Sequence, residues 1–148
     1  MLLRWSAELA VGVDTIDAQH EELFRRAGAL LEALHGSRGP QEIARLFPFL
    51  EEYAIEHFAA EEALMSQHGY PRMAEHVAQH RKLVEDLVPL KASLMKHGMT
   101  AKLASEASHF LQGWLLRHVA VSDQVLGAFI LAKEGRDAVA RACGMGGR

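Results

Sequence analysis

The feature that most constrains the fold is a set of apolar residues at alternating three- and four-residue spacing, repeated four times along the chain. That spacing places the apolar side chains on one face of a helix, because an α-helix turns once in about 3.6 residues. No segment shows the two-residue alternation of a half-buried strand. The four stripes begin at Ile16, Ile43, Met73 and Leu103 and end at Leu34, Met65, Leu94 and Val121. The sequence therefore predicts an all-α protein.

Glycines and prolines separate the four stripes. Gly36, Gly69 and Gly98 follow the expected helix ends, where a left-handed backbone conformation favours glycine. Pro40 and Pro71 fit the first turns of the next helices, where a missing N–H is tolerated. Because the connections are short, successive helices should be antiparallel neighbours in an up-down-up-down four-helix bundle.

The length of 148 residues favours one domain, 1–148. We expect an N-terminal arm over 1–13, the bundle over 14–123 and a C-terminal tail over 124–148. Asp14 or Thr15 can cap the first helix, and Thr100 can cap the fourth.

Charge and composition narrow the partners and the compartment. The net charge of −3 gives no reason to expect a nucleic-acid partner. The longest strongly apolar run, Val125 to Ala132, is too short to span a bilayer, so we expect no membrane insertion. A single cysteine, Cys143, excludes an internal disulfide framework and fits a reducing compartment. With no export signal recognised, we expect a cytoplasmic protein.

Four of the nine histidines have ordinary explanations. His35, His68 and His97 each directly precede a helix-ending glycine, where they can bind exposed carbonyls and interact with the helix dipole. His109 falls on the outer face of the fourth helix. None of these four is expected to bind a ligand.

The other five histidines and two carboxylates fall in or beside the buried stripes. His57 and Glu61 are four residues apart, as are His76 and His80, so each pair projects from one helix face. Asp123 follows a further histidine by five residues, a spacing that converges if the helix loosens or ends there. The seven residues are His20, His57, Glu61, His76, His80, His118 and Asp123.

Two carboxylates directed into a core need positive charge beside them. No lysine or arginine occupies these stripes nearby. A pair of metal ions would supply the charge, and imidazole and carboxylate donors without thiolate suit iron or manganese and tolerate zinc.

These seven residues and their neighbours resemble the signature of the hemerythrin family, specifically its bacterial members. The resemblance covers roughly residues 5–125. The matching segments are Ile16-Asp17-x-Gln19-His20, His57-Phe58-x-x-Glu61-Glu62, Gly69-Tyr70-Pro71 and Trp114-Leu115-x-x-His118. A hemerythrin-like domain is a four-helix bundle with a non-haem di-iron centre.

The resemblance implies a role for each of the seven residues. His76, His80 and His118 would bind one iron, and His20 and His57 the other. Glu61 and Asp123 would bridge the two ions together with an oxo or hydroxo group. The second iron would keep one open position, at which dioxygen binds reversibly for transport, storage or delivery. The protein would then be a carrier and not an enzyme.

The resemblance also implies an apolar dioxygen pocket formed by Leu23, Phe58, Trp114 and Val121. A pocket without a proton donor disfavours cleavage of the O–O bond. Gln19 and Glu62, which adjoin ligands in the sequence, are expected to support the ligands or lie at the surface.

Other functions remain open from the sequence. Ferritin-like oxidases or peroxidases use Glu-x-x-His motifs, and the chain contains two, at Glu32 to His35 and Glu106 to His109. Their positions are unfavourable, because His35 lies about 22 Å along its helix from His20. An oxygen- or redox-sensing module is another alternative, with the tail as contact surface and an unspecified protein partner. Iron-sulfur repair is disfavoured because a cysteine-bearing N-terminal segment is missing.

Overall fold

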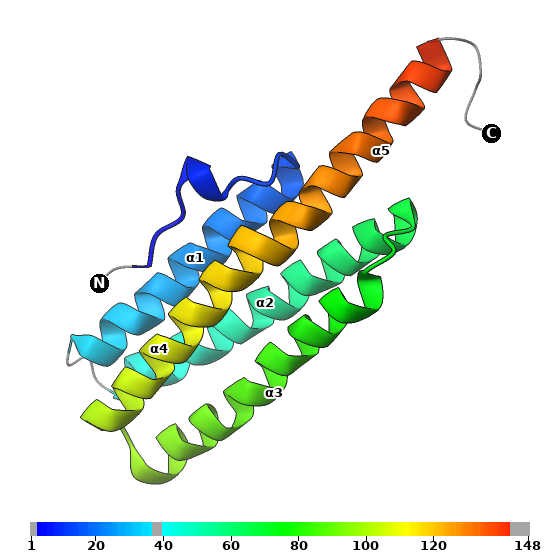
Figure 1. The fold of residues 1–148 in the computed structure, drawn as a ribbon. Coiled ribbons are helices and arrows are strands. Elements are labelled where there is room, and N and C mark those ends of the chain that lie inside the picture. Colours follow the sequence, from blue (N-terminus) through cyan, green and yellow to red (C-terminus); the bar gives the residue numbers. More distant parts are fainter. Residues whose placement is uncertain (1–2, 37–39, 143–148) are drawn as a thin grey trace.

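The computed structural model describes residues 3–36 and 40–142, and within them every regular element is a helix. Four long helices lie side by side and alternate in direction (Figure 1). The all-α four-helix bundle predicted from the stripes is therefore confirmed. The elements are η1 (Ala7–Leu9), α1 (Asp14–His35), α2 (Pro40–His68), α3 (Met73–His97), α4 (Ala101–Arg117), η2 (His118–Asp123) and α5 (Gln124–Ala142).

The predicted tail is helical over most of its length. Helix α5 continues from α4 through η2, and it projects past the end of the bundle (Figure 1). Residues 124–142 of the segment predicted as a tail are therefore a helical continuation of the fourth helix. Cys143 and the other residues of 143–148 lie outside the described residues.

The combined helix Ala101–Ala142 is long and apolar enough to cross a membrane by length and composition alone, a test that core helices also pass. Its apolar residues include Leu111, Leu115 and Leu126, each no more than 1% exposed inside the protein. Packing in the core accounts for these residues, whereas Leu116, Val121 and Val125 are exposed, and 39% of the most apolar 18-residue window is buried.

The arm is held by a carboxylate that sequence reasoning passed over. Helix α1 begins directly after Val13, and neither Asp14 nor Thr15 caps it. Instead, Asp17 accepts hydrogen bonds from the backbone N–H groups of Val11, at 2.7 Å, and Gly12, at 3.2 Å. At α4 the predicted cap is confirmed, because the Thr100 hydroxyl accepts the N–H of residue 103 at 3.0 Å.

The helix ends agree with the sequence in part. Gly69 and Gly98 have φ angles of 64° and 68°, the left-handed conformation predicted for them. Gly36 has a φ of −93°, so that prediction was wrong there. Pro40 is the first residue of α2, as predicted, whereas Pro71 lies in the turn before α3.

Two apolar clusters fill the bundle, and a polar layer lies between them. The larger cluster includes Leu23, Phe58 and Val119, and the smaller one includes Ile16 and Leu126. Along α1, α2 and η2–α5 the chain passes from one cluster to the other through a buried histidine or carboxylate. The functional side chains are therefore held between two packed cores, which restrict their movement.

Candidate metal centre

The polar layer is formed by the seven residues that the sequence singled out. One comes from α1, two from α2, two from α3 and two from η2. None of the seven is more than 4% exposed. They are His20, His57, Glu61, His76, His80, His118 and Asp123.

The element η2 explains how His118 and Asp123 reach the same layer. It is a six-residue π-helix, whose wider turn aligns residues five apart. In an α-helix the two side chains would point about 140° apart. The helix loosens here and does not end, which is one of the two possibilities that the five-residue spacing allowed.

Glu61 faces histidines from three helices with its two oxygens. Its Oε1 lies 3.0 Å from Nε2 of His76 and 3.0 Å from Nε2 of His80. Its Oε2 lies 2.9 Å from Nε2 of His57 and 3.2 Å from Nε2 of His20. One carboxylate thus serves two separate groups of imidazoles.

Asp123 divides its oxygens in the same way. Its Oδ1 lies 3.0 Å from Nε2 of His76 and 3.1 Å from Nε2 of His118. Its Oδ2 lies 2.9 Å from Nε2 of His20. The layer therefore has a three-histidine side and a two-histidine side, and each carboxylate directs one oxygen to each side.

The donor set fits a pair of cations. No lysine or arginine among the described residues contacts Glu61 or Asp123. Both Asp123 oxygens and Nε2 of His57 are buried without a hydrogen bond, although their neighbours lie near 3 Å. Imidazole nitrogens and carboxylate oxygens so arranged direct lone pairs at common points, which is the arrangement of metal ligands.

The charges within the layer change how its groups titrate. Burial by itself lowers the pKa of His20 and His76, but the carboxylates of Asp123 and Glu61 outweigh it and raise each pKa to about 9. Burial by itself raises the pKa of Glu61 and of Asp123, but hydrogen bonds from the surrounding imidazoles outweigh it and hold both pKa values below their usual values. Without a cation the layer retains protons at neutral pH, so an incoming metal ion must displace them.

Three of the five imidazoles are anchored at the nitrogen that points away from the centre. Nδ1 of His57 donates to Gln19 Oε1 at 2.8 Å, and Nδ1 of His80 donates to Glu62 Oε2 at 2.9 Å. These contacts give Gln19 and Glu62 the supporting position that was expected beside ligands.

Gln79 is a third supporting residue, and sequence reasoning missed it. Nδ1 of His118 donates to Gln79 Oε1 at 2.7 Å. Gln79 directly precedes His80, just as Gln19 precedes His20, and that parallel was the available signal. Its actual partner lies on another helix.

Aromatic rings cover the three-histidine side. Phe58 stacks on His80 with ring centroids 4.0 Å apart and an interplanar angle of 9°. Trp114 stacks on His118 at 4.4 Å and 15°. Leu23 is 1% exposed and belongs to the apolar cluster that contains Phe58 and borders Trp114. These three predicted pocket residues therefore adjoin the layer.

Val121 differs from these three, because its side chain is 62% exposed and lines a surface pocket together with Trp114 and His118. In a straight α-helix Val121, three residues after His118, would face inward beside it. The π-helix turns Asp123 inward in its place and leaves Val121 on the surface. That Val121 lines the dioxygen pocket stays a prediction, and its exposure does not fit an enclosed pocket.

The remaining histidines lie away from the layer. His35 contacts Ser108 of α4, and Nδ1 of His68 donates to the carbonyl of Leu64 at 2.9 Å. His97 and His109 are exposed. The two Glu-x-x-His motifs thus bring no ligand to the layer.

A four-helix bundle with a buried, two-sided histidine–carboxylate layer defines the class of cation-binding bundle proteins. Residues 11–130 match the model of the Hemerythrin HHE cation binding domain. The chain belongs to the hemerythrin family.

Relatives and solved structures agree with this assignment. A bacteriohemerythrin of Methylococcus capsulatus is 31% identical over 133 residues, which are 88% of this chain and 98% of that protein. A hemerythrin-like protein of Naegleria gruberi is 28% identical, covering 80% of this chain and 86% of the relative. The crystal structure of a wild-type hemerythrin superposes with a TM-score of 0.78 at 27% identity, covering 88% of this chain and 98% of that one.

Proposed function

We propose that the chain binds dioxygen reversibly at a carboxylate-bridged, non-haem di-iron site. The observation that carries the proposal is the unequal division of imidazoles between two sides that share Glu61 and Asp123. His76, His80 and His118 would hold one iron, and His20 and His57 the other. Iron in this donor set supplies reversible electron transfer to dioxygen, which zinc does not.

The division leaves one ion short of a protein ligand. Both sides receive one oxygen from each carboxylate, but the two-histidine side receives one nitrogen fewer. If both ions have the same preferred coordination number, the deficit is an open position for a small ligand. A closed set of ligands around both ions would leave no such position.

The surrounding side chains favour binding without further reaction. Phe58 also adjoins the two-histidine side, because its ring centroid lies 5.9 Å from that of His57, and Trp114 packs against Phe58 at 5.7 Å. Leu23 follows His20 by three residues and so lies on the same face of α1. Their apolar side chains limit the access of water, and none of the three donates a proton from a carboxyl, hydroxyl or amino group. Exclusion of water also slows the loss of a polar oxygen species from the pocket. These residues therefore favour carriage of dioxygen over its reduction.

Metal analysis combined with visible spectroscopy tests the proposal. The anaerobic protein is loaded with Fe²⁺, freed of excess metal, and taken through repeated cycles of oxygen and argon. We expect two irons per chain and an absorption change that appears with oxygen and reverses under argon. Failure to bind two irons, or an irreversible change in the first cycle, would contradict the proposal.

Further measurements on the same iron-loaded protein distinguish the alternatives. Sustained production of hydrogen peroxide or oxidation of an added donor would favour a di-iron oxidase or peroxidase. An oxygen- or redox-sensing role would require a partner that binds differently to the oxygenated and deoxygenated forms.

We place the carrier in the cytoplasm, a proposal that follows from the single cysteine and the reducing compartment it suits.

A further inference from the structure

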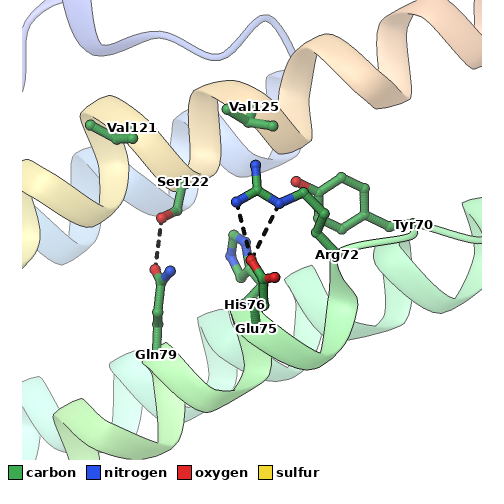
Figure 2. Close-up of a pocket in the computed structure, with 8 residues that line it drawn as sticks. All are labelled: Tyr70, Arg72, Glu75, His76, Gln79, Val121, Ser122 and Val125. Atoms are coloured by element: carbon green, nitrogen blue, oxygen red, sulfur yellow. Dashed lines mark hydrogen bonds and ion pairs between the residues drawn. The ribbon is translucent and has the colours of Figure 1, made fainter.

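The contacts of Gln79 connect α3 to both ends of the π-helix. Its Oε1 accepts a hydrogen bond from Nδ1 of His118 at 2.7 Å and another from Oγ of Ser122, also at 2.7 Å. Figure 2 shows Gln79 on α3 and Ser122 facing one another across the groove between the two helices. The two donors lie at the start and near the end of η2, so one oxygen atom holds the whole turn.

The hydrogen bond between Gln79 and Ser122 lies between two surface pockets. One surface pocket, lined partly by Tyr70 and His76, and a second, lined partly by Trp114 and His118, adjoin it. Gln79 and Ser122 line both pockets, so their hydrogen bond forms a bridge between them. Together with the contact between Asp123 Oδ1 and His76 Nε2, at 3.0 Å, it ties the later half of η2 to α3.

The hydrogen bond from Nδ1 of His118 to Gln79 also determines which nitrogen of His118 carries the proton. An imidazole that donates from Nδ1 to an amide oxygen keeps Nε2 free to bind a metal ion. Nε2 of His118 faces Asp123 Oδ1 in the layer, at 3.1 Å. Gln79 therefore fixes both the tautomer of His118 and the turn that presents Asp123.

We propose that Gln79 is a positioning residue, which clamps η2 so that His118 and Asp123 address the same metal ion. The inference rests on the proposed di-iron function for its consequence, and on the two hydrogen bonds for its geometry. Gln79 itself does not touch the ion. Loss of its oxygen should weaken metal binding on the three-histidine side. In metal sites generally, removal of a residue that hydrogen-bonds a ligand lowers metal affinity about 10- to 100-fold.

The experiment compares variants that keep or remove the acceptor. Gln79→Met keeps the length of the side chain but cannot accept either bond, Gln79→Glu keeps an acceptor oxygen, and Ser122→Ala removes one bond only. Gln67→Met makes the same change at an exposed position of α2 and serves as the control. Each protein is loaded with Fe²⁺ under argon and mixed with an Fe²⁺ chelator.

We expect Gln79→Met to lose one of its two irons about 10- to 100-fold faster than the wild type. Gln79→Glu should restore slow loss, whereas a purely space-filling role would be satisfied by methionine. Ser122→Ala should have a smaller effect, and Gln67→Met none. Equal rates in Gln79→Met and the wild type would overturn the proposal.

A second measurement needs no metal. Amide hydrogen exchange of residues 118–124 in the metal-free protein should be faster in Gln79→Met than in Gln67→Met, because the clamp on η2 is gone. Unchanged exchange would also overturn the proposal. If the wild type fails to bind iron, the proposed function fails, while this comparison still decides whether Gln79 clamps the turn.

Discussion

Oδ1 of Asp123 lies 3.1 Å from Nε2 of His118, although the two residues are five positions apart. The contact exists because η2 is a π-helix, and it pairs two candidate metal ligands at a spacing that no α-helix would bring together. π-turns inside helices are frequently found at functional sites, and this one inserts a residue where the ligands are required.

His118→Ala should lower bound iron well below two per chain. The substitution leaves the three-histidine side with two imidazoles and leaves the π-helix without its first ligand. Iron per chain, measured after loading with Fe²⁺ and removal of excess metal, checks the prediction. His109→Ala, at an exposed position of α4, is the matched control and should retain the wild-type content. Two irons per chain in His118→Ala would refute the assignment of His118.

The stability of the metal-free protein should fall as the pH rises above neutrality. The pKa values of His20 and His76 are raised from 6.5 to about 9 in the folded state. Their stabilising effect is fully present below pH 6.5 and is lost as the pH rises through 9. The lowered pKa values of Glu61 and Asp123 give the opposite sign, with stabilisation present above the unfolded values of 4.5 and 3.8. The metal-free protein should therefore be most stable between about pH 4.5 and 6.5.

Thermal unfolding of the metal-free and iron-loaded proteins at pH 6, 7.5 and 9 measures this effect. In the loaded protein the imidazole nitrogens bind metal instead of protons, so the decline between pH 6 and 9 should be absent. Asp123→Asn, which removes one of the charges that raises these pKa values, should reduce the decline in the metal-free protein. A metal-free protein whose Tm rises steadily from pH 6 to 9 would contradict the prediction.

The sequence was sufficient to predict the bundle and the seven buried donors, because helical periodicity and four-residue spacing are local properties. The sequence-based predictions failed where contacts between segments distant in the sequence determine the structure. Asp17 was overlooked because its partners are backbone groups of the arm. Gln79 was overlooked because its partners lie on the π-turn, whose geometry the spacing left open. The continuation of the fourth helix beyond Asp123 was not foreseen, because the inserted π-turn shifts the buried face onto Leu126 and Ile130. The same turn leaves Val121 exposed.

Leu23→Glu should suppress oxygen binding. Leu23 is 1% exposed beside the layer, and a carboxylate there can occupy the open position or bring water and a proton to it. Leu23→Met, which nearly conserves volume, should retain binding and shows whether the site tolerates a change of shape. The absorption change on oxygenation measures the effect, and circular dichroism confirms that each variant is folded.

Val121→Glu provides the contrast for that experiment. Because Val121 is 62% exposed, a glutamate there stays in solvent and should leave the oxygenated spectrum unchanged. Suppression by Val121→Glu, or an unchanged spectrum in folded Leu23→Glu, would show that the pocket lies elsewhere.

Two glycines of α5 should respond in opposite ways to alanine. A Cβ at Gly127 would lie 2.5 Å from the carbonyl oxygen of Val11, so the arm that packs here must move. Overpacking of this kind costs about 1–3 kcal/mol, and Gly127→Ala should lower the free energy of unfolding by that order. At Gly135 a Cβ would meet no atom within 4 Å beyond its chain neighbours and the backbone of its own helix, and Gly135→Ala should stabilise by about 0.4–1 kcal/mol through the unfolded state. Urea unfolding of the metal-free protein measures both. Equal shifts in the two variants would mean that α5 does not pack against the arm at Gly127.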